Sequence, residues 1–468
     1  MKVLLINPDQ PEYIRPKEYY IPASLMCLGS MLRQNGIDAK MLDLNVIKYK
    51  RKTNTSDAII KKIEEYKPNL IGLTIMGAPV FTTTLLYSNI IKNKFPDIKI
   101  IIGGMHSTLF HKEILEHCDS IDYAADGPGE IAIVKLVKYL LGEISIESVP
   151  SIAYKLNGKV NVNKREEIID LSLLPKLDYD LVEDINDFYH EGLSTQWHNP
   201  KKHNIRTSLA TYATRGCPVC CNFCAMYKMM GKKWNNRPYM DVVDEIEMLY
   251  NKYGDSHFSF LDDSLTLNRT NIISICNEII KRGLDLQLAT PNGVYINSLN
   301  KEVLDAMYEA GFIRIMLAIE SGNEWMRNKI MHKNLKNEKI YEIIALAKSY
   351  KNLQIGACFV IGMPEETNET LQDTYDMVVN IDVDYPAVHN IVPYPGTELF
   401  NQCYTDNLFI KDIDVNNLWN MDIFYIMDNK QFFIKPYNLS IEELNTFRKK
   451  IDDVVNIYAV NDFKIRER

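Results

Sequence analysis

The chain lacks a long hydrophobic run. None of its apolar stretches is long enough to span a bilayer, and only four apolar residues separate Lys2 from Asn7 at its start. We therefore expect neither a membrane span nor a signal peptide. The nine cysteines show no paired spacing typical of disulfides, which favours a reducing, cytoplasmic location. A net charge of −8 argues against nucleic acid as the principal partner.

The sequence also lacks an obvious acid–base constellation, so we assign no catalytic residue. Its composition is nevertheless that of a globular protein. A chain of 468 residues with 46% hydrophobic and 24% charged content is long enough for two or three domains with cores of their own, and disorder is not expected.

The most informative segment is the octapeptide Cys217-Pro218-Val219-Cys220-Cys221-Asn222-Phe223-Cys224, which follows an expected strand over residues 208–214. Its C-x3-C-x2-C spacing predicts three thiolates on an iron–sulfur cluster, with one iron left open for a small molecule. A zinc site is the alternative, because the loop also contains two C-x2-C pairs. Adjacent Cys220 and Cys221 can hardly both face one tetrahedral metal, so we favour the cluster.

The first 145 residues alternate short apolar runs with helical patterns. The predicted strands are 3–6, 39–42, 70–75, 98–102 and 122–125, which together indicate a doubly wound, Rossmann-like α/β domain with a parallel sheet. Such sheets bind ligands beyond the carboxyl ends of their strands. Small and turn-forming residues there let a flat ligand approach the backbone. The candidates are Asn7, Thr74, Met76, Gly77, Gly103, Gly104, Met105, Gly127, Gly129 and Glu130.

A linker with a small hairpin is expected over residues 146–205, because residues 152–162 alternate around Asn157-Gly158. Strands and helices then alternate again over residues 206–400, enough for a six-strand partial barrel whose chemistry lies at the carboxyl ends of its strands. Two strand ends carry polar motifs: Asp262-Asp263-Ser264 and Glu320-Ser321-Gly322. Residues 401–468 are expected to form a small accessory region.

The cysteine loop resembles the signature loop of the radical S-adenosylmethionine (SAM) superfamily. This resemblance implies that Cys217, Cys221 and Cys224 hold a 4Fe-4S cluster, that Cys220 is a spare thiol and that Phe223 lies beside the adenine of SAM. It further implies that Asp262 and Asp263 receive the amino group of SAM. The same two residues can equally cap the next helix. Glu320 and Ser321 would bind the ribose or the methionine portion.

The order of the domains extends the resemblance to the branch of radical SAM enzymes that carries a cobalamin-binding domain. The corrin would sit on the strand ends of the first domain, with its tail along 103–104 and 127–130. The motif D-x-H-x-x-G, which supplies an axial histidine elsewhere, is absent, since the loop after Ile6 reads Asn7-Pro8-Asp9-Gln10-Pro11. Three alternatives are open for this domain: it has lost cobalamin, it binds another ligand as a flavodoxin-like module, or it is purely structural.

This resemblance implies a cobalamin-dependent methyltransferase. A 5′-deoxyadenosyl radical would abstract hydrogen, and methylcobalamin would then supply a methyl group to an unactivated carbon, or less readily a phosphorus, of a small molecule or peptide. Cyclisation or rearrangement with both cofactors is one alternative, and a non-enzymatic cobalamin or metal sensor is another. Methylthiolation is disfavoured, because the first domain has only Cys27 and Cys118 for a second cluster. The expected partner is a low-potential electron donor such as a flavodoxin or ferredoxin.

Overall fold

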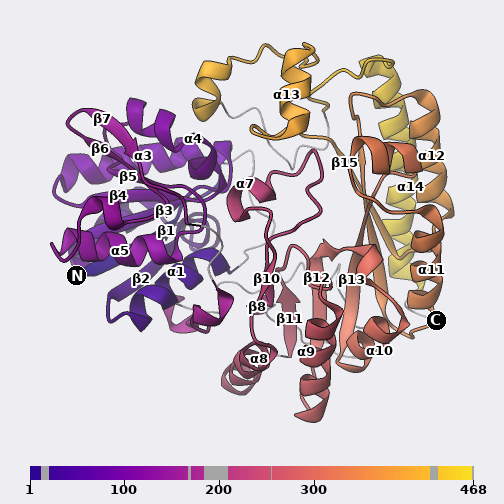
Figure 1. The fold of residues 1–468 in the computed structure, drawn as a ribbon, viewed down its shortest axis with the longest axis horizontal. Helices are drawn as coiled ribbons and strands as arrows, with labels where there is room; N and C mark the ends of the chain where they lie inside the picture. Colours follow the sequence, from indigo (N-terminus) through magenta and orange to yellow (C-terminus); the bar gives the residue numbers. More distant parts are fainter. Residues whose placement is uncertain (12–20, 167–169, 184–208, 255, 422–430, 466–468) are drawn as a thin grey trace. The chain divides into compact units, whose positions relative to one another are not determined.

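The computed structural model describes residues 1–11, 21–166, 170–183, 209–254, 256–421 and 431–465 (Figure 1). The predicted linker is therefore only partly described, because 167–169 and 184–205 lie outside these ranges, as does Ser208 at the start of the predicted barrel strand. The chain divides into two compact units, one of residues 1–192, 228–231 and 414–427 and one of the remainder. Within the described ranges, no helix combines the length and the apolar content needed to cross a membrane.

The first unit is built on a seven-stranded sheet whose core strands are buried on both faces. Val3 to Ile6 of one interior strand, for example, are fully buried, as the strands of a parallel sheet covered by helices are. In sheet order the strands are β2 (Asp38–Asp43), β1 (Lys2–Asn7), β3 (Leu70–Thr74), β4 (Lys99–Gly103), β5 (Tyr123–Ala125), β6 (Ile152–Leu156) and β7 (Lys159–Val162). The helices are α1 (Ala23–Gln34), α2 (Thr55–Tyr66), α3 (Ala78–Lys94), α4 (Met105–His117) and α5 (Glu130–Leu140).

The five predicted parallel strands are confirmed as β1 to β5. The hairpin around Asn157-Gly158 is also present, but the expectation that it belongs to a linker is wrong. Its first strand, β6, pairs antiparallel with β5, so that the hairpin extends the sheet of the first unit. The edge strand β5 offers unpaired backbone groups, and the hairpin covers them.

The second unit contains the predicted six-stranded parallel sheet. Its order is β15 (Tyr385–Asn390), β14 (Gln354–Ile361), β13 (Phe312–Glu320), β12 (Gln287–Val294), β11 (His257–Phe260) and β8 (Leu209–Thr211). The sequential order of the strands, with alternating helices, is that of a partial barrel. The helices are α7 (Met226–Met230), α8 (Tyr239–Tyr253), α9 (Arg269–Lys281), α10 (Lys301–Glu309), α11 (Asn337–Lys348), α12 (Asn368–Asn380), α13 (Glu398–Thr405) and α14 (Ile441–Ile465). In Figure 1, α11, α12 and α14 stand together beside β15.

The predicted first barrel strand is shorter than expected. After β8 the chain leaves the sheet, and Thr214–Arg215 form a second short strand, β9, which pairs antiparallel with β10 (Asn235–Asn236). The reason is that the Asp262 carboxylate takes the backbone N–H groups of Ala213 and Thr214, which are then no longer available to a sheet neighbour.

The C-terminal region does not form one accessory region as expected. Residues 414–427 belong to the first unit. There Trp419 packs on the core of the first sheet, stacks on His117 at 4.9 Å and meets the edge of Phe81 at 6.0 Å. Its carbonyl oxygen lies 2.8 Å from Nε2 of His106, a buried side chain whose pKa is lowered to about 4 by burial.

We expect Trp419→Ala to destabilise α3 and α4 by about 2 kcal/mol, because it removes a large apolar contact from the core of the first unit. Amide hydrogen exchange in these two helices should become roughly 30-fold faster, since 1.4 kcal/mol corresponds to a factor of ten. Trp325→Ala is the matched control, as this indole is 51% exposed. Equal exchange in α4 of the two variants would contradict the role assigned to Trp419.

Candidate functional site

The cysteine loop is closed at its base by a backbone contact that only glycine permits. The pair β9–β10 joins the two ends of the loop over residues 216–234. Gly216, directly before Cys217, has a φ of +86°, and a Cβ there would lie 2.2 Å from the carbonyl oxygen of Lys233. A side chain at this position would force the ends of the loop apart.

The residues that follow β11 anchor the same loop. The buried Asp262 carboxylate accepts hydrogen bonds from the Ala213 N–H at 3.0 Å and from the Thr214 hydroxyl at 2.6 Å. The N–H of Gly216 donates to Asp263, and the Ser264 hydroxyl donates to Cys217 Sγ at 3.3 Å. Three consecutive residues thus fix the position of the first cysteine.

This anchoring gives Asp262 a structural role beside the predicted one. Burial raises its pKa to about 7, against the lowering effect of the hydrogen bonds from Thr214 and Ala213. Burial likewise raises the pKa of Asp263, while Gly216 and Arg215 lower it. Because the acceptor capacity of Asp262 is largely used by the chain itself, the amino group of SAM is more readily assigned to Asp263. Both assignments remain predictions.

Of the three predicted ligand thiols, Cys221 is buried and Cys217 and Cys224 are half-buried. Burial raises the pKa of Cys221 to about 12, and charges on Cys224 and Cys217 add to the rise, so these sulfurs are near neighbours. Burial also raises the pKa of Cys224, with Cys217 contributing. Among the described residues, no three His, Cys, Asp or Glu side chains are placed to hold a single metal ion. A cubane cluster binds each thiolate at a different iron, so its ligands do not converge on one point.

A buried cation lies beside these thiols. Lys333 is 7% exposed, and its Nζ lies 2.6 Å from Oε1 of Glu320, the last residue of β13. Burial lowers the pKa of Lys333, but Glu320 and Cys221 outweigh it, so that the net shift is upward and the group stays charged. Three thiolates on an iron–sulfur core leave net negative charge, which a neighbouring ammonium stabilises. The residues present therefore fit a cluster.

Glu320 has a strained backbone, whereas Ser321 and Gly322 pack against a helix. Glu320 has a φ of +76° at a register shift between β13 and β14, a conformation that L residues adopt rarely and that is common at functional sites. The Ser321 hydroxyl lies 3.2 Å from that of Thr374 on α12, and a Cβ on Gly322 would lie 2.3 Å from the carbonyl oxygen of Asp373. The predicted role of Ser321 toward the cofactor remains a prediction.

The remaining loop residues offer an apolar face and one open acceptor. Phe223 is half-buried and packs on a cluster that includes Met326, Met363 and Ile391. Asn222 is 6% exposed, and within the described ranges its Oδ1 has no hydrogen-bond partner. An unsatisfied buried acceptor is costly unless a ligand uses it, which fits a bound molecule next to Cys221.

The predicted corrin-binding residues lie at the carboxyl edge of the first sheet. The parallel pairing places Thr74 opposite Gly103, and the Ile75 N–H donates to the Gly103 carbonyl oxygen at 2.7 Å. Asn7 ends β1 and donates to Asp43 at 2.6 Å. Met76, which follows β3, is 65% exposed. The remaining predicted residues lie at or just before the starts of the helices that follow β3, β4 and β5: Gly77, Gly104, Met105, Gly127, Gly129 and Glu130.

The glycines at this edge are of two kinds. Gly104 (φ +98°) is required by packing, because a Cβ would lie 2.5 Å from the Ile75 carbonyl oxygen, and Gly127 is favoured by its φ of +93°, which L residues rarely adopt. A Cβ added at Gly77 or at Gly103 would come no closer than 3.8 Å to any protein atom outside the adjacent residues. Their missing side chains therefore leave backbone open beside the exposed Met76, which fits a large flat ligand.

The loop after β1, where other cobalamin domains carry a histidine, is held by internal bonds. The buried Asp9 carboxylate lies 2.7 Å from Lys48 Nζ and accepts a short hydrogen bond from Tyr87. Asn45 donates to the Pro8 carbonyl oxygen and accepts from the Gln10 N–H.

Three residues of the site were not predicted from the sequence to have a role: Gly216, Asn222 and Lys333. Gly216 could have been found from its place directly before the first cysteine. Asn222 lies inside the motif but has no distinctive chemistry in the sequence. Lys333 carried no signal, because only the tertiary fold buries it beside Glu320.

Comparisons with known proteins agree with this geometry. The Radical SAM superfamily matches residues 211–378, and the B12 binding domain matches residues 14–137. An uncharacterized methyltransferase of Pyrococcus horikoshii is 27% identical over 88% of this chain and 84% of its own. A cytidylyl-2-hydroxyethylphosphonate methyltransferase of Streptomyces wedmorensis is 25% identical over 86% and 81%, respectively. An anaerobic magnesium-protoporphyrin IX monomethyl ester cyclase of Rubrivivax gelatinosus is 27% identical over 86% and 70%.

Among solved structures, the radical SAM methyltransferase TsrM of Kitasatospora setae, with cobalamin and a 4Fe-4S cluster bound, superposes with a TM-score of 0.72. It is 18% identical, over 88% of this chain and 79% of its own. The second unit is thus a radical SAM domain and the first a B12-binding domain. The chain belongs to the cobalamin-dependent radical SAM enzymes, whose cofactors are a 4Fe-4S cluster, SAM and cobalamin.

Replacing the ligand cysteines tests the assignment within the loop. Cys217→Ala, Cys221→Ala and Cys224→Ala should each abolish the cluster, because two thiolates are too few to hold it. Cys220→Ala should retain it, and so serves as the control with the same chemical change in the same loop. Iron and sulfide analysis of anaerobically reconstituted protein measures both. Equal iron loss from all four variants would overturn the ligand assignment.

Proposed function

We propose that this radical SAM methyltransferase delivers a methyl group to an unactivated carbon of a small molecule or peptide. The observation that carries the proposal is the presence, in one chain, of a cluster-binding cysteine loop and a cobalamin-type sheet edge. When bound, the cluster and SAM supply a radical able to remove a hydrogen atom, and cobalamin supplies the methyl group.

The residues of the second unit bind and orient SAM. Lys333 is the buried cation available to the carboxylate of SAM, and Asp263 and Asn222 supply acceptors for its ammonium group. Phe223 and the apolar cluster around Met363 supply the face against which an adenine packs. This apolar face also excludes water from a reactive site.

The loop after β14 contributes a rigid backbone to the same region. The fully buried Glu366 carboxylate accepts hydrogen bonds from the N–H groups of Gly362 at 2.7 Å and of Met363 at 3.1 Å. This bonding fixes the strand exit on which the adenine would lie. A pre-ordered loop loses less entropy when a ligand binds.

In the first unit, the open backbone of Gly77 and Gly103 and the apolar surface of Met76 would receive the corrin. The cobalt would then have no histidine ligand from the loop after β1, because that loop carries Asp9, which is committed to Lys48 and Tyr87. The proposal also includes a cytoplasmic location and a low-potential electron donor of the flavodoxin or ferredoxin class.

The methyl acceptor is proposed to be carbon, and phosphorus is the alternative acceptor atom.

Cyclisation is the second candidate, because a magnesium-protoporphyrin ester cyclase is as similar to this chain as the methyltransferases are. The two reactions differ in their SAM-derived products. Methylation of carbon by this route uses two molecules of SAM, one as methyl source and one as radical source. Cyclisation needs no methyl donor.

We expect equal amounts of S-adenosylhomocysteine and 5′-deoxyadenosine when the reconstituted enzyme, cobalamin, SAM and a reductant are incubated with a small-molecule extract of cells that lack the enzyme. Chromatography with mass detection measures both products. The Cys217→Ala protein is the control for background hydrolysis. Formation of 5′-deoxyadenosine without S-adenosylhomocysteine would reject methyl transfer and favour cyclisation.

Lys333→Met should weaken SAM binding to the reconstituted protein by at least about tenfold, because a buried charge-assisted bond is lost. Lys333→Arg keeps the charge and should retain most of the affinity, which separates the charge from a general loss of structure. Calorimetric titration with SAM measures binding, and iron analysis shows that the cluster remains. Unchanged affinity in Lys333→Met would contradict the proposed role of this side chain.

A further inference from the structure

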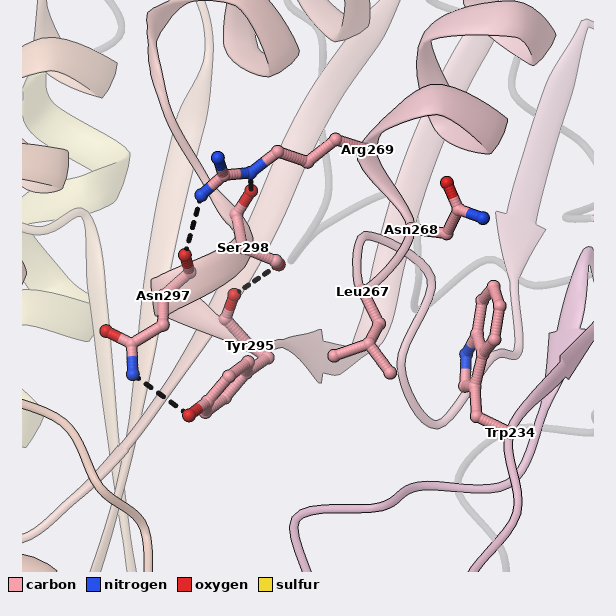
Figure 2. A pocket seen from close by; sticks show the side chains of 7 residues that line it. All are labelled: Trp234, Leu267, Asn268, Arg269, Tyr295, Asn297 and Ser298. Atoms are coloured by element: carbon pink, nitrogen blue, oxygen red, sulfur yellow. Dashed lines mark hydrogen bonds between the residues drawn. The ribbon is translucent and has the colours of Figure 1, made fainter.

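A surface depression lies next to the cluster-binding loop within the second unit. It has a volume of about 540 Å³ and lies between three loops (Figure 2). Trp234 comes from the end of the cysteine loop, Leu267 and Arg269 from the segment after β11, and Tyr295 and Asn297 from the segment after β12. Trp234 is thus the one lining residue that also belongs to the cysteine loop.

A short chain of bonds joins this depression to the cluster ligands. The Trp234 indole N–H donates to the carbonyl oxygen of Ser264 at 3.3 Å, and the hydroxyl of the same Ser264 donates to Cys217 Sγ at 3.3 Å. One residue and two hydrogen bonds therefore separate an aromatic ring that lines the surface from a thiolate of the cluster. Such bonded contacts provide a route for electrons.

The polar groups around the depression are already bonded to one another. Arg269 donates to the carbonyl oxygens of Ser298 at 2.8 Å and Asn297 at 2.9 Å, and the Asn297 amide donates to the Tyr295 hydroxyl and to the Asn334 carbonyl oxygen. A small-molecule site needs convergent polar groups that are free to bind the ligand. Most of the polar lining here is held by the protein itself, while Trp234, Leu267 and Tyr295 supply apolar surface, which suits a protein partner.

The charge of the surroundings indicates the kind of partner. The lining residues of this depression include the cation Arg269 and no carboxylate. Lys232 and Lys233, which precede Trp234, are both exposed. Arg269, Lys232 and Lys233 together bring three positive charges to this part of the second unit. Positive charge around an apolar centre attracts an acidic protein and raises its association rate.

We propose that the depression at Trp234 is the docking site of an acidic, low-potential electron-transfer protein of the flavodoxin class, and that Trp234 and Ser264 form the route to the cluster. One electron leaves the reduced donor and one enters the cluster at each encounter, with no bond broken. This inference rests on the proposed radical function, because that function requires an electron for the cluster. It concerns only the reduction of the cluster, so it can be tested without a methyl acceptor.

The test is the rate of cluster reduction in anaerobic stopped flow, with fully reduced bacterial flavodoxin as the donor. Replacing Lys232 and Lys233 together by Glu should slow the second-order rate at least about tenfold at low salt, and the difference should shrink at high salt. The matched control is the double change Lys449→Glu and Lys450→Glu on α14, which alters the net charge equally. Both should be reduced normally by titanium(III) citrate, which shows that the cluster is intact.

Trp234→Leu tests the route rather than the attraction. It should lower the limiting rate at saturating flavodoxin while leaving reduction by titanium(III) citrate unchanged. Equal slowing by the two lysine pairs, or an unchanged limiting rate in Trp234→Leu, would overturn the proposal. Neither result would affect the product ratio by which methyl transfer is judged, so the two proposals fail separately.

Discussion

The hydrogen bonds of Asp262 are the interaction on which the second unit depends. Its carboxylate ends β8 by taking the N–H groups of Ala213 and Thr214, and so turns the chain out of the sheet. Each bond of this kind contributes about 0.5–1.5 kcal/mol, and about 1.5–3 kcal/mol when the carboxylate is ionised. Without them, Gly216 would not reach its contact with Lys233, and the cysteine loop would lose its closed base.

The same anchoring links the geometry of the cluster to its electrostatics. Ser264, two residues beyond Asp262, donates its hydroxyl to Cys217, and hydrogen bonds to cluster sulfurs are among the factors that set a reduction potential. In addition, Lys333 places a buried positive charge next to Cys221. Since the cost of burying Lys333 is offset by Glu320, removing either partner leaves an unpaired charge, at a cost of about 3–5 kcal/mol. One buried ion pair thus serves both the stability of the strand end and the charge of the site.

Much of the fold could be predicted because its signals are local. Runs of buried apolar residues mark β1 to β5, and the spacing of Cys217, Cys221 and Cys224 needs no tertiary structure to be read. What could not be predicted depends on distant partners. The Asn157-Gly158 turn predicts a hairpin, but not the edge at which it pairs. Asp262 has the same sequence signal whether it caps a helix, binds SAM or, as observed, bonds to Ala213 and Thr214.

Trp419 shows the same limit across a long stretch of chain, because its carbonyl oxygen bonds His106, 313 residues earlier. Joining such distant segments costs little more than joining nearer ones, since closure entropy grows only with the logarithm of the loop length. The core of the B12-binding unit can therefore be completed by a segment that follows the radical SAM domain. As a consequence, the first unit acquires its full core only when nearly the whole chain is present. The two cofactor-binding units then form as parts of one polypeptide rather than as independent modules.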